Sequence, residues 1–201
     1  MRRITIEGLT SSGTELLALR DLLSRGGVAA IPTETFYGLA ADPHDEEAVR
    51  RIVGAKGRDD ARAMPVLFSR PADLAGLGVT APEQSLAPYF RIWPAALTVV
   101  VAIREPVAAS RGACTLAIRI PASAPLRRVL EFTGPLTATS ANRSGQPPMD
   151  DPEAVERLFE GSIDLLVDGG RTPGGLPSTI LDSTEDPPRV LRPGAFAWPG
   201  K

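Results

Sequence analysis

Polar clusters and cations follow several short apolar runs of this sequence. Thr33, Glu34 and Thr35 come directly after the run 28–31, and Ser140 and Asn142 come after the run 136–139. In open α/β sheets, ligands commonly bind where strands end. Cations accompany the clusters at five positions: Lys56, Arg58, Arg62, Arg119 and Arg192. Arginine offers phosphate or carboxylate a two-pronged fork and lysine a point charge, so the pattern predicts an anion-binding cleft.

The same inventory excludes several other chemistries. The only histidine, His44, stands at the start of a predicted helix, so it completes no Ser/His/Asp arrangement. One histidine and one cysteine cannot build a typical structural zinc site. The sequence has no glycine-rich Walker loop. Any phosphate chemistry must therefore rest on charge and positioning, and Cys114 is expected to be a small core residue.

Each of these signals has a structural alternative. Lys56 and Arg58 could form a solvated helix end favoured by the helix dipole. Arg119 could be an edge-strand residue, and Ser140 and Asn142 could be ordinary turn residues. Spacing alone predicts a soluble α/β domain with an anion site, and no more.

The elements that must position these residues interleave along the chain. Ser12 and Glu15 have the spacing of a capping box, and the residues after them form a leucine stripe that ends at Gly26. Similar patterns predict helices at 12–25, 45–55, 82–90, 124–132 and 151–159. Strands are predicted at 28–31, 64–68, 97–103, 115–120, 136–139, 165–167, 179–181 and 190–191. Several strands follow one another directly, so we expect one twisted, mixed sheet flanked by helices.

Composition narrows the class of protein. A length of 201 residues fits one domain. A net charge of −2 and an aromatic content of 5% disfavour extended RNA binding, and they leave room for a weak contact with tRNA. No apolar run reaches the roughly 20 residues of a membrane span. The first residues have no signal-peptide apolar core, so a cytoplasmic location is expected.

Five longer motifs together resemble the YrdC-like family of threonylcarbamoyl-AMP synthases. They occur in family order and accompany the triplet 56–58. The five motifs cover residues 31–39 (IPTETFYGL), 116–121 (LAIRIP), 134–145 (GPLTATSANRSG), 177–182 (PSTILD) and 191–195 (LRPGA). Short triplets of this kind are weak signals, whereas five longer motifs in order make a chance match very improbable.

The resemblance implies a single YrdC-like domain over residues 5–197. Its α/β (α+β-like) fold would have a twisted mixed parallel/antiparallel sheet, flanking helices and a concave ligand cleft. The implied reaction joins L-threonine, bicarbonate or CO2, and ATP with Mg²⁺, giving threonylcarbamoyl-AMP and pyrophosphate. Downstream proteins would then transfer the threonylcarbamoyl group to tRNA adenosine. These substrates and partners are expectations from the resemblance.

The resemblance also implies roles for individual residues. Lys56 and Arg58 would be catalytic. The expected ATP-binding residues are Lys56, Arg58, Arg62, Thr115, Ser140, Asn142 and Arg192. The expected L-threonine-binding residues are Thr35, Arg119 and Ser178. No protein metal ligand is expected, since Mg²⁺ can be held by phosphates.

The sequence departs from the family pattern at a few positions. Asp59 and Ala63 stand where prolines are common, Leu67 stands where many members have histidine, and residues 94–96 differ from the usual Pro-Gly-Pro. Two other functions stay open: a carbamoyl-adenylate-forming domain of hydrogenase-maturation type, and a non-catalytic RNA-binding module. These functions are separated by measuring pyrophosphate release from ATP in three mixtures: with L-threonine and bicarbonate, with carbamoyl phosphate, and with no substrate.

Overall fold

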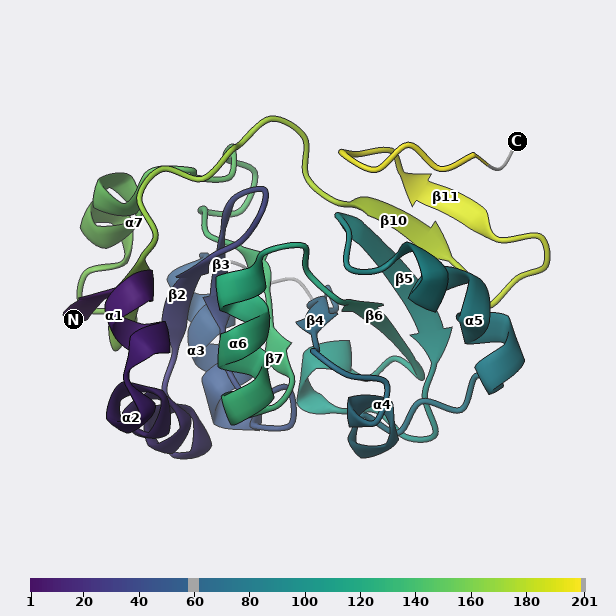
Figure 1. The fold of residues 1–201 in the computed structure, drawn as a ribbon, viewed down its shortest axis with the longest axis horizontal. Coiled ribbons are helices and arrows are strands. Elements are labelled where there is room, and N and C mark those ends of the chain that lie inside the picture. The colour runs from purple at the N-terminus through teal and green to yellow at the C-terminus, as the bar shows by residue number, and fades with distance from the viewer. Residues whose placement is uncertain (58–61, 200–201) are drawn as a thin grey trace.

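The computed structural model describes residues 1–57 and 62–199, and two mixed sheets stand side by side in it (Figure 1). Sheet A has five strands in the order β1 (Arg2–Thr5), β9 (Leu165–Asp168), β2 (Ala29–Pro32), β3 (Tyr37–Ala40) and β8 (Thr139–Ser140). Sheet B has six, in the order β11 (Arg189–Arg192), β10 (Thr179–Asp182), β5 (Leu97–Ala102), β6 (Thr115–Arg119), β4 (Val66–Leu67) and β7 (Leu136–Thr137).

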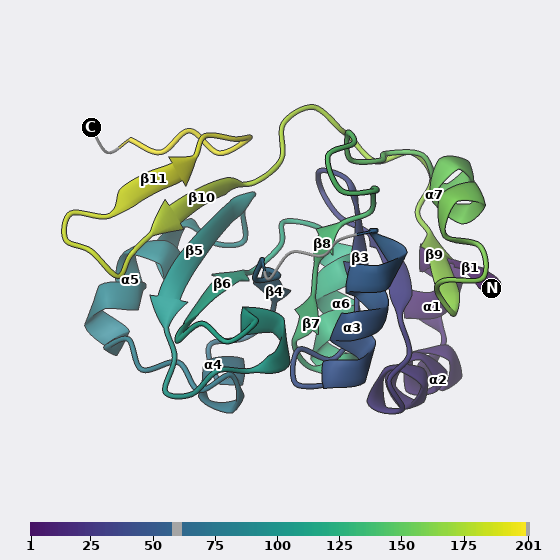
Figure 2. The same cartoon turned by 180° about the vertical axis from the view of Figure 1, so that it is seen from behind.

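Helices cover both faces of sheet A, as the two opposite views show (Figures 1 and 2). One face carries α1 (Ile6–Ser11), α2 (Gly13–Ser24) and α6 (Ala124–Thr133), whose leucines share a core with β2 and β9. The other face carries α3 (Glu46–Ala55) and α7 (Pro152–Phe159). Their apolar residues join a larger core that runs on into sheet B, beside α4 (Asp73–Gly76), α5 (Glu83–Ile92) and the short 3-10 helix η1 (Ala108–Ser110).

The helix starts follow from the predicted caps. The Ser12 hydroxyl accepts from Glu15 N at 3.2 Å and begins α2, as the capping-box spacing predicts. Asp45 accepts from Ala48 N at 2.9 Å and begins α3. Lys56 is the C-cap of α3, so this helix positions it at the junction between the sheets.

The expectation of one sheet is wrong, because the predicted strand at 136–139 is divided between two sheets. Its first part, β7, pairs with β4 in sheet B, and β8 pairs with β3 in sheet A. Ala138, between them, donates its N–H to Pro65 O at 2.8 Å, outside both ladders. A strand cannot continue in one sheet once its backbone groups turn to another partner, so residues 136–140 cross from sheet B to sheet A.

Other boundaries differ in smaller ways. The strand β3 is buried at every residue, so it shows no polar alternation by which the sequence could reveal it. Only Val66 and Leu67 of the predicted strand 64–68 pair as a strand. Cys114 lies in the loop before β6 and is exposed, so its expected place in the core is wrong. Throughout residues 1–57 and 62–199, each helix is too short or too polar to cross a bilayer.

Candidate active site

A cavity of about 380 Å³ lies between the two sheets. Six of the predicted ligand-binding residues line it: Thr35, Arg62, Arg119, Ser140, Ser178 and Arg192. Thr35 and Ser140 come from sheet A and its loops, whereas Arg119, Ser178 and Arg192 come from sheet B. The junction of the sheets therefore gathers residues that are far apart in the sequence, and it does so at strand ends.

A second cavity of the same volume, beside α2 and β9, is a weaker candidate. The charged side chains that line it already form ion pairs with one another. They are Arg2–Glu15, Arg25–Asp21 and Arg51–Asp164. The cavity between the sheets instead holds Arg119, whose Nε has no hydrogen-bond partner among the described residues, which makes it the better anion site.

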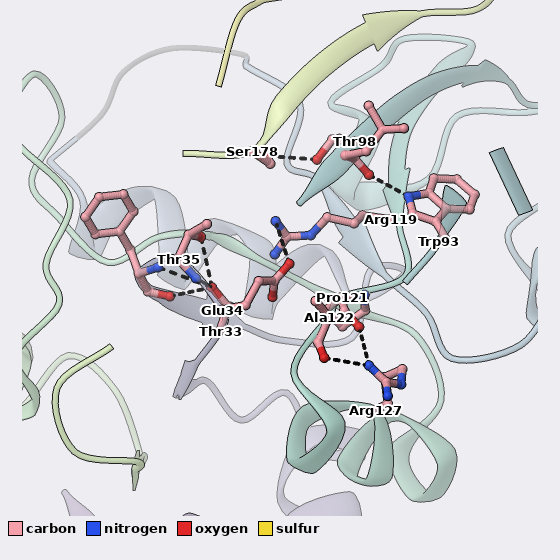
Figure 3. Close-up of polar contacts among 12 residues, drawn as sticks. Thr33, Glu34, Thr35, Trp93, Thr98, Arg119, Pro121, Ala122, Arg127 and Ser178 are labelled. Carbon is pink, nitrogen blue, oxygen red and sulfur yellow. Dashed lines mark hydrogen bonds and ion pairs between the residues drawn. The ribbon is translucent and has the colours of Figure 1, made fainter. Parts of the chain in front are cut away.

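Arg119 ends β6 and is 5% exposed. Its Nη1 lies 3.5 Å from Glu34 Oε1 in the loop after β2 (Figure 3). Within the described part of the chain, neither Glu34 oxygen nor Arg119 Nε has a hydrogen-bond partner. Burial lowers the pKa of Arg119, which the Glu34 charge opposes and the Arg192 charge reinforces. The guanidinium is thus held in place with hydrogen-bonding capacity unused, as a receptor for an anion would be.

Arg192 ends β11 and fixes the segment before β10. Its Nε and Nη2 donate to Ser178 O at 3.2 and 2.8 Å, and Nη2 also lies 3.3 Å from Ser178 Oγ. Burial lowers the pKa of Arg192. A guanidinium remains charged even so, and Arg192 joins Arg62 and Arg119 as the third cationic side chain of the cavity lining.

Two threonines before β3 organise the opposite wall. Thr33 Oγ1 donates to Phe36 O at 2.7 Å and lies 3.1 Å from Thr35 Oγ1 (Figure 3). Thr33 Oγ1 also accepts from Thr35 N at 3.1 Å and from Phe36 N at 3.3 Å, so both of its lone pairs are occupied by backbone N–H groups. The Thr35 hydroxyl is therefore not committed to Thr33, and it can donate to or accept from a ligand in the cavity.

Lys56 does not line the cavity, although it stands behind one wall of it. The side chain is fully buried, and Nζ donates to Asn142 O and Asn142 Oδ1, both at 3.0 Å, and to Ser140 O. Asn142 Oδ1 also accepts from Ser140 Oγ at 2.6 Å, and its Nδ2 donates to Gln146 O at 2.6 Å. Lys56 and Asn142 thus organise the turn that presents Ser140 to the cavity.

The remaining predicted residues are placed differently. Thr115 begins β6 opposite Ala102 and lies outside the cavity lining. Four strand steps separate it from Arg119, a span of about 13 Å. Arg58 lies outside the described residues.

Sequence reasoning missed Thr98 as a member of the site. Thr98 is 1% exposed, lines the cavity, and places its Oγ1 2.9 Å from Ser178 Oγ (Figure 3). A signal for it existed, since Thr98 is the one polar residue in the apolar run 97–103. Leu67, a noted departure from the family, also lines the cavity.

Carboxylate, histidine and thiol groups do not gather into a metal centre in residues 1–57 and 62–199: no three of them are placed to hold one ion. Glu34, which stands between the lining residues Thr33 and Thr35, faces Arg119. The described side chains therefore do not fit a protein-held Mg²⁺.

Known proteins share this sequence and this architecture. The Sua5/YciO/YrdC family model, described as "Telomere recombination", matches residues 21–194. A threonylcarbamoyl-AMP synthase of Pyrococcus abyssi is 38% identical over 87% of this chain and 52% of its own length. One of Thiobacillus denitrificans is 35% identical over 82% of this chain and 88% of its own.

The structural likeness points the same way. The structure of P. abyssi Sua5 complexed with L-threonine has a TM-score of 0.84 and 35% identity, covering 96% of this chain and 56% of that one. The chain thus spans about half the length of the P. abyssi protein.

Proposed function

Because the chain belongs to the Sua5/YciO/YrdC family, we propose that it is an L-threonylcarbamoyladenylate synthase. The threonine nitrogen adds to CO2, drawn from bicarbonate, and loses a proton, which gives a carbamate. A carbamate oxygen then attacks the α-phosphorus of ATP while the bond to the β-phosphate oxygen breaks. The products are threonylcarbamoyl-AMP and pyrophosphate, and the domain that carries the activity spans residues 5–197.

The observation that carries the proposal is that three arginines and several hydroxyl groups line one cavity. We assign the threonine carboxylate to Arg119, whose guanidinium has hydrogen-bonding capacity unused. Thr35 and Ser178 would bind the amino acid on the two sides of that carboxylate. The relative solved with L-threonine supports an amino-acid substrate for this domain.

The nucleotide would occupy the side of the cavity lined by Ser140, Arg62 and Arg192. Arg58 joins this group by family resemblance. Lys56 would act from behind the wall, by holding the turn that carries Ser140 and by adding positive charge. Thr115 receives no role in this proposal, since it lies outside the cavity lining.

The reaction explains why three arginines line this cavity. A carbamate and a triphosphate are both anions and repel each other, so the attack needs positive charge placed in advance. No general base is needed once the carbamate has formed, which agrees with a site that lacks histidine. Mg²⁺ enters the proposal only as a counter-ion of the ATP phosphates, and no step here is derived through it.

The adenylate is reactive, so proteins that transfer the threonylcarbamoyl group to tRNA would have to consume it soon after release. We place this chemistry in the cytoplasm, where tRNA and ATP are both available. A weak contact of this chain with tRNA belongs to the same proposal.

Pyrophosphate release tests the proposal directly. Purified protein is given ATP with L-threonine and bicarbonate, with carbamoyl phosphate, or with neither. We expect release only in the first mixture, and loss of it in Arg119→Met. Release with carbamoyl phosphate alone would favour the carbamoyl-adenylate reaction, and no release in any mixture would contradict an adenylate-forming enzyme.

A further inference from the structure

The hydroxyl pair formed by Thr98 and Ser178 has a direction that its surroundings determine. The two oxygen atoms are 2.9 Å apart, and both residues line the cavity between the sheets. Ser178 is 9% exposed and Thr98 1%, so Ser178 is the member nearer to a ligand. Distance alone leaves open which of the two hydroxyls donates.

Arg192 supplies the first constraint. Its Nη2 lies 3.3 Å from Ser178 Oγ, and a guanidinium can only donate. One lone pair of Ser178 Oγ is therefore occupied from the side of β11. The same guanidinium also donates to Ser178 O, so it is held in place relative to this oxygen.

Burial of Thr98 supplies the second constraint. Among the described residues, Ser178 Oγ is the sole hydrogen-bond partner of Thr98 Oγ1. If Ser178 donated to Thr98, the Thr98 hydroxyl hydrogen would be left buried without an acceptor, which is an unfavourable state. Thr98 is therefore the donor, and it occupies the second lone pair of Ser178 Oγ.

We propose that Thr98 is a positioning residue that fixes the Ser178 hydroxyl as a hydrogen-bond donor to the bound amino acid. Both lone pairs of Ser178 Oγ are then occupied, so this hydroxyl can bind a ligand only by donating its hydrogen. Such a donor selects an acceptor, and the carboxylate beside Arg119 is the acceptor at hand. This inference rests on the proposed function for the identity of the substrate, and on the hydrogen bonds alone for the direction of the hydroxyl.

The donor also orients the ligand. On the sheet B side of the cavity, the Ser178 hydroxyl lies next to the cationic side chain of Arg192. An α-amino acid fits when its carboxylate faces Ser178.

Three variants test the role of Thr98 in the pyrophosphate-release assay. Thr98→Val replaces the hydroxyl by a methyl group of similar volume and is expected to raise KM for L-threonine about 10-fold, with KM for ATP unchanged. Thr98→Ser keeps the hydroxyl and is expected to restore the parent KM. Thr133→Val is the control, because it removes a hydroxyl that donates to Val129 O within α6, away from the cavity.

The double variant Thr98→Val/Ser178→Ala decides whether Thr98 acts through Ser178. We expect its KM for L-threonine to equal that of Ser178→Ala alone. The inference would be overturned if the increases in KM for L-threonine of the two single variants multiplied in the double variant. It would also be overturned if Thr98→Val had the KM of the parent. A fall in kcat without a change in KM would overturn it too.

A substrate-free readout separates this inference from the proposed function. If the parent protein shows no threonine-dependent release, the proposed function fails, and a crystal structure of Thr98→Val still tests whether Thr98 positions Ser178. We expect Ser178 Oγ to leave hydrogen-bond distance of Arg192 in that variant. An unchanged Ser178 rotamer would contradict a positioning role.

Discussion

Arg119 and Glu34 form a buried ion pair whose closest charged atoms, Nη1 and Oε1, are 3.5 Å apart. The side chains are 6% and 16% exposed. By contrast, the exposed pair Arg128–Glu131 has a similar separation of 3.4 Å, with side chains 51% and 45% exposed. The second pair, which lies within α6, serves as the exposed control for the first.

The buried pair should make a non-additive contribution to stability. Glu34→Gln is expected to lower the free energy of unfolding by about 3 kcal/mol, because it leaves Arg119 charged and uncompensated. Arg119→Met should cost a similar amount, and the double variant less than the sum. Urea denaturation measures all three. Glu131→Gln is the control and should change the value by less than about 1 kcal/mol; equal effects at Glu34 and Glu131 would contradict the prediction.

Lys56 should behave as a structural residue as well as a functional one. Lys56→Met keeps most of the side-chain volume and leaves the acceptors on Ser140 and Asn142 without the ammonium. We expect a loss of about 1–3 kcal/mol in the free energy of unfolding and weaker ATP binding by calorimetry. Far-UV circular dichroism should be unchanged. Weaker ATP binding at full stability would instead indicate a direct phosphate ligand.

Substrate preference should survive the replacement of the family histidine by Leu67. An apolar wall separates threonine from valine by only about 10²-fold, whereas buried groups that bond the hydroxyl reach roughly 10⁴-fold or more. Thr35 still lines the cavity and can bond the threonine hydroxyl. We expect kcat/KM to rank L-threonine above L-serine, with L-valine nearly inert, and Leu67→His to leave that order intact. Equal turnover of valine and threonine would refute this.

The only histidine should make stability depend on pH. A hydrogen bond with Asp42 raises the pKa of His44 above its ordinary value of 6.5, although partial burial opposes the shift. Since the folded-state pKa is the higher one, the stabilisation is present in acid and is lost as pH rises through it. As pH rises through the folded-state pKa of His44, the Tm of the parent protein should therefore fall more than the Tm of His44→Gln. Asp42→Asn should remove the same pH-dependent fall in Tm. If the plots of Tm against pH for the parent and the two variants are parallel, the effect is excluded.

Residues with a strong local pattern were predictable. The helix at 45–55 has an aspartate cap and an apolar stripe, and the structure has α3 at Glu46–Ala55. The strand 115–120 alternates in sequence, and β6 occupies Thr115–Arg119 with Arg119 facing the cavity. Five of the six predicted ligand residues at the cavity stand at strand ends or in the loops beside them, which sequence position reveals, whereas Arg62 lies in the loop before β4.

What the sequence could not supply depends on long-range pairing. Nothing local in the run 136–139 indicates that Leu136 pairs in one sheet and Thr139 in the other, because both are acceptable strand residues. The burial of Lys56 is similar: its acceptors on Ser140 and Asn142 are more than 80 residues away in the chain. A charged residue at a helix end reads as solvated until those partners are known.

The chain crosses between the two sheets at Ala138, so the spacing of residues at this point fixes how the two walls of the site lie relative to each other. A single residue separates β7 from β8, and its N–H is tied to Pro65 O. Side chains alternate between faces every residue, so one inserted or deleted residue here would exchange inward and outward positions in a ladder of sheet A or sheet B. Either change would move Ser140 relative to Arg119. The separation between the two walls of the cavity therefore depends on the single residue between β7 and β8.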